Sequence, residues 1–282
     1  MRKRSYYSVR TGKLDASEGL SLEELREFFV TSYTEFEEKG FFQERLGINC
    51  TDGYIAGTVG DVELYSFRVL RRKGLFPIWQ RKEELTEDEI FDLIEFLYDH
   101  ASQPIDEGHY HSFCDCGYHF SEFIKGSASD EFRASLNDIL KDYGEGFELS
   151  KDGEILTRPG GSLDPLLQVD VPGEDPKNIA ERVETAVKKF RQRSSSWDQR
   201  RDAIRDLADV LEFLRPELKQ VLNTKDEAAL FEIANNFGIR HHNLNQKTDY
   251  DQPIWLSWIF YFYLATIHAA TRMIEKKNKT SE

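Results

Sequence analysis

The sequence predicts a mainly α-helical protein: an N-terminal α-rich domain with minor β content, a short β-ribbon, and a four-to-five-helix C-terminal bundle. Helix-start signals recur along the chain, such as Ser21 followed three residues later by Glu24. Apolar residues then follow at helical spacing, whereas strand-like alternation is clear in one stretch near residue 150. The 282 residues are 39% hydrophobic and 31% charged, which is typical of soluble globular proteins.

The predicted N-terminal domain covers residues 1–143 and contains four amphipathic helices. Capping signals at Ser21, Asp61 and Thr86 open the first three, and Gly40 and Gly74 follow the ends of the first two. The four helices are expected at about 22–39, 62–73, 87–100 and 130–143.

A ribbon and linker are expected over residues 144–175, because Lys151-Asp152-Gly153 is a turn signal between two short alternating runs. The two strands are Phe147–Leu149 and Glu154–Leu156, and a segment rich in Pro and Gly follows. The bundle then occupies residues 176–282. Its helices are expected at about 176–193, 197–216, 228–237 and 251–276.

The last predicted helix contains an uncharged run, Ile254–Thr271, that approaches the length of a membrane span. The run includes polar residues such as Ser257 and His268, and its N-terminal flank is acidic at Asp249 and Asp251. These features favour a central helix buried by its neighbours, and no membrane association is expected.

The net charge of −14 disfavours broad contact with nucleic acid, so any such contact must be local. The three cysteines, Cys50, Cys114 and Cys116, cannot all pair within one chain, and no secretion leader opens the sequence. A reducing, cytoplasmic location is therefore expected.

Five soft ligands lie within eleven positions in the N-terminal domain: His109, His111, Cys114, Cys116 and His119. Zinc binds Cys and His in tetrahedral sites, so a zinc loop is one interpretation. Structural zinc sites usually have ligand pairs two to four residues apart in two separate clusters, and this spacing is tighter. The sequence alone therefore favours an aromatic loop in which these side chains are incidental, and no metal or other cofactor is predicted.

The loop from Gly238 to Asp251 is the leading candidate for a catalytic site. It contains Arg240, His241, His242 and Asn243 ahead of the positive end of a long helix, an arrangement suited to phosphate. In a ribonuclease mechanism, one histidine would take the ribose 2′-hydroxyl proton while Arg240 stabilises the charge on phosphorus. The alternative is that Arg240 pairs with nearby aspartates and the loop only joins helices.

A basic cluster in the bundle is the candidate surface for binding a nucleic-acid backbone, with Trp197 available for stacking. The alternative is a solvated helix face on which these residues pair with acids one turn away. The predicted substrate-binding residues are Lys188, Lys189, Arg191, Arg193, Arg200 and Arg201.

The ribbon, the irregular stretch and the bundle with Gly238-Ile239-Arg240-His241 before its last long helix together resemble the HEPN-like C-terminal domains of bacterial abortive-infection proteins of the AbiJ type. The likeness covers about residues 144–276. The resemblance implies a helical bundle, frequent dimerisation, a role in phage defence, and metal-independent RNA cleavage by an Arg-x4-6-His motif. Arg240 matches the motif arginine and His241 the polar residue after it. At the position of the motif histidine this chain has Asn245, Gln246 and Lys247, so His241 or His242 would have to substitute.

The leading functional prediction is thus a cytoplasmic bacterial defence or stress protein. Its bundle would bind RNA or a nucleotide phosphate and act as a metal-independent ribonuclease. The alternative is a non-catalytic module that forms a homodimer through the bundle and recognises a protein partner through residues 1–143. A zinc-stabilised sensor is the third interpretation.

Overall fold

The computed structural model of the chain describes residues 6–13, 19–113, 116–158, 166–167, 171, 176–221, 232 and 251–281. Two compact units divide the chain, Met1–Leu156 and Thr157–Glu282. The fold is mainly α-helical, as the sequence predicts, and its strands are short. The boundary between the units lies within the predicted ribbon, whose first strand is buried in the core of the N-terminal unit.

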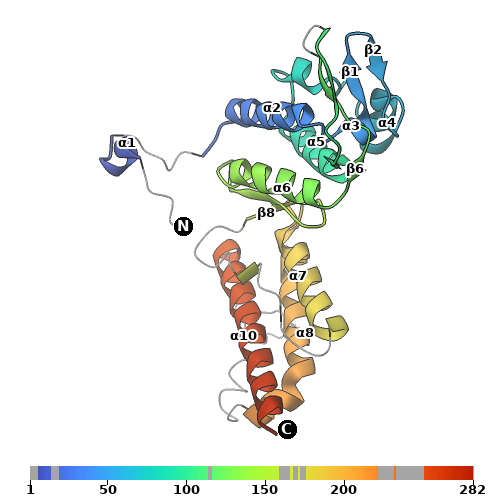
Figure 1. Cartoon of the computed structure of the whole chain (residues 1–282). Coiled ribbons are helices and arrows are strands. Elements are labelled where there is room, and N and C mark those ends of the chain that lie inside the picture. The colour runs from blue at the N-terminus through green and yellow to red at the C-terminus, as the bar shows by residue number, and fades with distance from the viewer. Residues whose placement is uncertain are drawn as a thin grey trace. The chain divides into compact units, whose positions relative to one another are not determined.

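Among the described residues, the N-terminal unit contains helices and four small two-stranded sheets, three of them antiparallel (Figure 1). The last of these strands ends at Thr157, the first residue of the C-terminal unit. The helices are α1 (Tyr7–Arg10), α2 (Leu22–Glu38), α3 (Gln43–Leu46), α4 (Val62–Leu70), η1 (Ile78–Arg81), α5 (Glu87–His100) and α6 (Ser127–Leu140). The strand pairs are β1 (Ile48–Cys50) with β2 (Gly53–Ile55), β3 (Gln103–Pro104) with β6 (Phe123–Ile124), β4 (His109–His111) with β5 (Gly117–His119), and β7 (Phe147–Leu149) with β8 (Ile155–Thr157).

Local signals in the sequence explain where the main helices of this unit begin. Ser21 and Thr86 each form a complete capping box, with Glu24 and Glu89, and the Asp61 side chain caps α4. Helices α2, α5 and α6 pack around one core, in which the rings of Phe36, Phe42 and Phe132 meet edge to face. This core supports the short strand pairs.

Helix α4 ends at Leu70, three residues earlier than predicted. Arg71 adopts a left-handed conformation with φ of 60°, and its N–H closes the last turn onto Phe67. The Glu63 carboxylate then accepts hydrogen bonds from the backbone of Gly74 and Phe76, which turns the chain back along the helix. Hydrogen bonds between residues 11 and 13 positions apart therefore accompany the end of α4, and the spacing of apolar residues does not reveal them.

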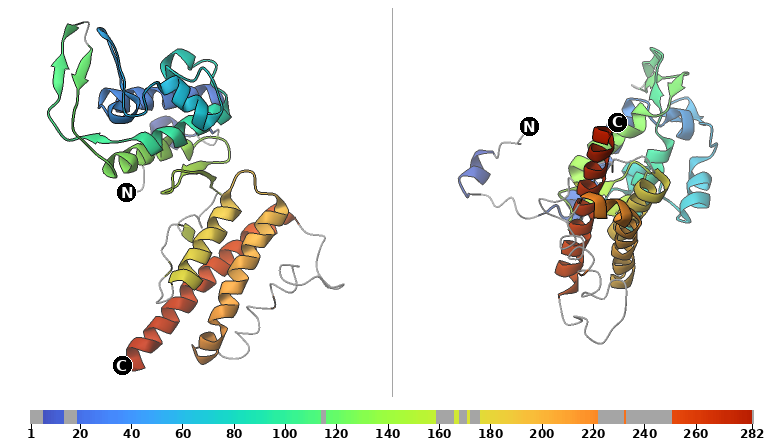
Figure 2. Two further views of the ribbon diagram at one scale, coloured as in Figure 1. Left: turned by 90° about the vertical axis from the view of Figure 1, so that its right-hand side faces the viewer. Right: turned by 90° about the horizontal axis from the view of Figure 1, so that it is seen from below.

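In the C-terminal unit, η4 (Pro176–Ala180) leads into α7 (Glu181–Arg191), followed by α8 (Trp197–Val221) and α10 (Gln252–Ser281). Helix α8 packs against both α7 and α10, and the three helices run alongside one another (Figure 2). The rings of Phe190 and Phe260 stack at 4.0 Å in their shared core. The helix predicted at about 228–237 lies outside the described residues.

Helix α8 continues through Pro216, the predicted end of this helix. Proline inside a helix removes a hydrogen bond and costs about 3 kcal/mol. Leu214 and Leu218, on either side of it, are 2% and 0% exposed, and burial of these side chains offsets that cost.

Helix α10 is long and apolar enough to span a membrane, and it is the only such candidate among the described residues. Slightly more than half of its most apolar window is buried inside the protein, and Leu256, Phe260 and Leu264 belong to the bundle core. Core helices of soluble proteins have this character, so α10 is weak evidence for a membrane span.

Candidate metal centre

Four side chains that ligate metals converge where two hairpins of the N-terminal unit meet. The donor atoms of Cys50, His111, Cys116 and His119 all lie within 4.8 Å of one another. Cys50 Sγ lies 3.3 Å from His111 Nδ1, and Cys116 Sγ lies 3.2 Å from His119 Nε2. Two sulfur and two nitrogen donors are thus gathered in one half-buried cluster.

The backbone of each hairpin places its ligands at the junction. Cys50 ends β1 and pairs across the turn with Gly53, whose φ of +125° closes that turn. Cys116 immediately precedes β5, and Gly117 follows it with φ of +92° opposite His111 on β4. Both sulfur ligands therefore sit beside glycines that allow a sharp change of chain direction.

Contacts away from the ligands hold the β4–β5 hairpin beside the β1–β2 hairpin (Figure 1). The Gln43 side chain donates to the Tyr118 carbonyl at 2.9 Å and accepts from the Phe120 N–H at 3.1 Å, which ties α3 to β5. The Phe120 ring lies against Gly40 and Gly108, where an added Cβ would approach it to 2.5 Å and 2.7 Å. These contacts hold the end of the hairpin at His119, whereas His111 and Cys116 lie at its turn end.

The spacing of the donors fits a tetrahedral zinc ion. Zinc bonds of about 2.0–2.3 Å place tetrahedral donors roughly 3.3–3.8 Å apart. The sulfur–nitrogen pairs at 3.3 and 3.2 Å lie at or just below the lower end of this range, and all four donor atoms lie within 4.8 Å of one another. Small side-chain movements would therefore bring them to tetrahedral spacing.

Asp52 contacts two of the four donor residues and could orient them toward such an ion. An Asp52 carboxylate oxygen lies 3.6 Å from His111 Nε2, the ring nitrogen that does not face Cys50. A carboxylate on the far side of a ligating histidine orients the ring and raises its basicity. The Asp52 N–H also points at Cys50 Sγ, 3.4 Å away, where it would stabilise a thiolate.

The surroundings of Cys116 disfavour ionisation of its thiol. Partial burial raises the pKa of the Cys116 thiol, the Cys50 sulfur raises it further, and a hydrogen bond from the Thr51 backbone lowers it. A bound dication reverses the net effect by favouring the thiolate form.

The four side chains could supply all the ligands of a tetrahedral ion, as protein side chains do in structural Cys2His2 zinc sites. Comparison with protein-family models, curated proteins and solved structures finds no match to this chain.

The ligand set that the sequence suggests differs in part from this cluster. His111, Cys116 and His119 are in the cluster, whereas His109 is exposed on β4 outside it and Cys114 lies outside the described residues. Cys50 was missed because it is far upstream in the chain. The one local signal is the turn Cys50-Thr-Asp-Gly53, which puts a cysteine at the end of a hairpin.

Of the other predicted site residues, Arg240, His241, His242 and Asn243 lie outside the described residues. The basic cluster on α7 and α8 is described, and several of its members have partners. Lys189 pairs with Asp206 at 2.5 Å and Arg201 with Asp198 at 2.6 Å. The second pair is spaced i,i+3 along α8, whereas the first joins α7 to α8.

The remaining basic residues are also engaged. Arg191 is 4% exposed and donates from Nε to the Thr157 carbonyl, whereas the Arg200 guanidinium lies 5.1 Å from the Trp197 ring. Lys188 and Arg193 likewise have interaction partners. A cavity of about 400 Å³ in this unit is lined by other residues: Lys177, Asn178, Glu181, Arg182, Thr185, Asp206 and Asp209.

Proposed function

We propose that the N-terminal unit is a zinc-binding module in which one Zn²⁺ is held by Cys50, His111, Cys116 and His119. The observation that carries this proposal is the convergence of four soft donor atoms within 4.8 Å from hairpins distant in the sequence. Sulfur and imidazole donors in this combination select zinc among the common divalent ions.

The surroundings of the cluster support a structural role for the ion. Isolated two-stranded hairpins are marginally stable in water, and these two present exposed apolar side chains near their ends. Tyr54, Tyr110 and Phe113 are 44%, 47% and 62% exposed. With so little apolar burial, a metal cross-link is the interaction that can hold the hairpin ends together.

The metal content of purified variants tests the proposal. We expect about one zinc per chain in protein purified under reducing conditions, and a large loss of zinc in Cys50→Ser and in Cys116→Ser. His109→Ser is the matched control, because this exposed histidine lies two residues from His111 and outside the cluster. Cys114→Ser tests the ligand set, because the four described donors already suffice for a tetrahedral ion. A protein without zinc, or one that loses zinc in Cys114→Ser but not in Cys50→Ser, contradicts this ligand set.

For the C-terminal unit we propose the function that the resemblance implies: binding of RNA or a nucleotide phosphate by a bundle that forms homodimers, in a cytoplasmic defence or stress protein. The support is the residue content of the 238–251 loop and its place before the last long helix, which begins at Gln252. Because Arg191 is buried and Lys189 and Arg201 pair with acids, the loop is a better candidate for phosphate contact than the basic cluster.

Cleavage of labelled RNA without added metal tests the second proposal. We expect cleavage by the full chain and its loss in Arg240→Ala and in a double His241→Ala, His242→Ala variant. Lys247→Ala, in the same loop, is the matched control and should retain activity. Intact RNA after long incubation with excess protein would instead favour the non-catalytic interaction module. Chelator is omitted because it would also remove zinc from the N-terminal unit.

A further inference from the structure

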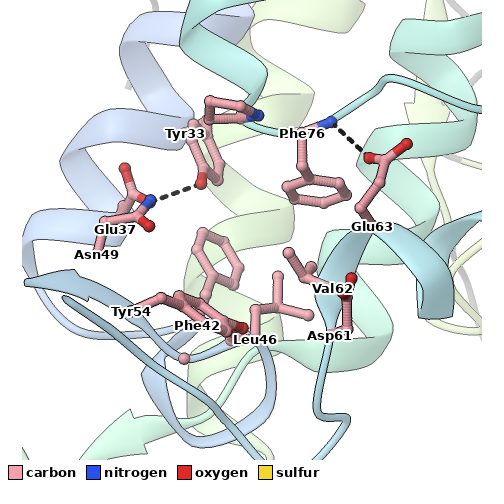
Figure 3. Close-up of a pocket in the computed structure, with 12 residues that line it drawn as sticks. Tyr33, Glu37, Phe42, Leu46, Asn49, Tyr54, Asp61, Val62, Glu63 and Phe76 are labelled. Carbon is pink, nitrogen blue, oxygen red and sulfur yellow. Dashed lines mark hydrogen bonds between the residues drawn. The ribbon is translucent and has the colours of Figure 1, made fainter.

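A cavity of about 260 Å³ opens in the N-terminal unit beside the hairpin that carries Cys50 (Figure 3). It is bordered by α2, by the β1–β2 hairpin, and by the start of α4. Aromatic side chains form much of its wall, and the rings of Phe42 and Phe76 point toward its middle. The lining residues are Tyr33, Glu37, Phe42, Leu46, Gly47, Asn49, Tyr54, Asp61, Val62, Glu63, Phe76 and Pro77.

All the charged residues that line this cavity are acidic. Its lining contains the carboxylates Glu37, Asp61 and Glu63 and no Lys, Arg or His. Two of these carboxylates accept hydrogen bonds from the backbone: Asp61 accepts one of 3.0 Å from the Leu64 N–H, and Glu63 accepts two from N–H groups after α4. Glu37 is the acidic group left for a ligand.

Glu37 is only partly paired. One of its oxygens, Oε1, accepts a hydrogen bond of 2.7 Å from the Tyr33 hydroxyl. Within the described part of the chain, Glu37 has no cationic partner and no second hydrogen bond. A half-buried carboxylate in that situation has lost solvation without full compensation, which favours a ligand that brings an N–H donor or a positive charge.

Burial raises the pKa of the Glu37 carboxyl, the Tyr33 hydrogen bond lowers it, and Glu38 raises it further. Burial also raises the pKa of Tyr33 well above its usual value, so this hydroxyl stays protonated and remains a donor. A ligand cation at Glu37 would relieve the burial penalty of the carboxylate.

The aromatic wall favours an organic cation. Tyr33 and Phe42 stack at 5.6 Å, and the face of an aromatic ring attracts a positive charge. A bare metal ion does not fit this pattern, because the three carboxylates do not come together as a group of metal ligands in the described residues.

We propose that this cavity binds a small organic amine in its ammonium form, with the ammonium at Glu37 and the apolar part of the ligand between Phe42 and Phe76. The volume suits a compact ligand, because drug-sized pockets usually exceed about 300 Å³. This site is separate from the zinc ligands, since none of the four lines the cavity.

Three probes of nearly equal shape and different charge test the proposal by NMR titration of the full chain as purified. We expect saturable binding of 2-phenylethylamine, binding of 2-phenylethanol weaker by roughly ten- to a hundredfold, and no binding of phenylacetate. Equal binding of the amine and the alcohol, preference for phenylacetate, or no saturable shift with millimolar amine would each overturn the proposal.

Two variants locate the ammonium. Glu37→Gln keeps the size and the hydrogen-bonding capacity of the side chain and removes its charge, so the preference for amine over alcohol should vanish. Glu38→Gln removes an adjacent exposed charge that does not line the cavity and should keep the preference. Loss of the preference in Glu38→Gln, or its retention in Glu37→Gln, contradicts the assignment. Chemical shifts outside the cavity show that each variant is folded.

Discussion

Removal of the metal should destabilise the N-terminal unit by a predictable amount. A ligand bound only by the folded state adds about 2.7 kcal/mol of stability at a free concentration of 100 times Kd, and about 4.1 kcal/mol at 1,000 times Kd. A second estimate treats the ion as a cross-link between Cys50 and His111, which closes a loop of about 60 residues in the unfolded chain. A loop of that size corresponds to about 4 kcal/mol.

The two estimates agree on a loss of about 3–4 kcal/mol, which for a unit of this size is a fall in Tm of roughly 6–16 °C. Thermal unfolding with and without excess chelator, under reducing conditions, measures the fall. Hydrogen exchange read by mass spectrometry locates it: peptides covering 48–55 and 109–119 should exchange faster without metal, whereas peptides from α7 and α8 should not change. His109→Ser should respond to chelator as the wild type does. A Tm that moves by less than about 1 °C, with unchanged exchange at both hairpins, would refute the reasoning.

Three further predictions follow from ionisation and from the shared hairpin. His100 is 6% exposed and its pKa is lowered, chiefly by burial, so its neutral form is stabilising above the usual pKa of 6.5 and that stability is lost as pH falls below it. Urea midpoints between pH 7 and pH 5 should therefore fall more in the wild type than in His100→Phe, and parallel curves would exclude this role. The pKa of Glu37 is raised, so the contribution of this side chain to stability falls as pH rises above its usual pKa of 4.5. Glu37→Gln should therefore have a higher Tm than the wild type at pH 7, and the two Tm values should lie closer together at pH 4. A lower Tm of Glu37→Gln at pH 7 would contradict this. Asn49 and Tyr54 line the cavity and lie next to Cys50 and Gly53 in the same hairpin, so Cys50→Ser should weaken amine binding. Glu37→Gln should leave the zinc content unchanged, and loss of zinc in this variant would show that the two sites are not separate.

Much of the helical framework could be predicted because its signals are local. Ser21 and Thr86 begin helices through hydrogen bonds to residues three positions away, and those partners are visible in the sequence. The turn around Gly153 similarly places β7 and β8 side by side. The end of α4 could not be predicted, because Glu63 sets it through backbone groups beyond the helix.

The sequence could reveal only part of the candidate metal centre, for a physical reason. The three ligands between His111 and His119 are close in sequence, but Cys50 reaches them through packing of one hairpin on another. Strands β1 and β2 have no fully buried residue, so burial imposes no alternation of apolar and polar residues on them, and neither was predicted. Judging the site by spacing along the chain therefore favoured the incidental interpretation. His268, in the uncharged run of α10, is 5% exposed, and neither of its ring nitrogens has a hydrogen-bond partner among the described residues.

X-ray absorption at the zinc edge counts the donor types around the ion and therefore examines the Cys2His2 assignment itself. We expect two sulfur ligands at about 2.3 Å and two nitrogen ligands at about 2.0 Å in the wild type, and one sulfur fewer in any zinc retained by Cys50→Ser. A wild-type shell with no sulfur, or a shell that keeps both sulfurs in Cys50→Ser, would contradict it.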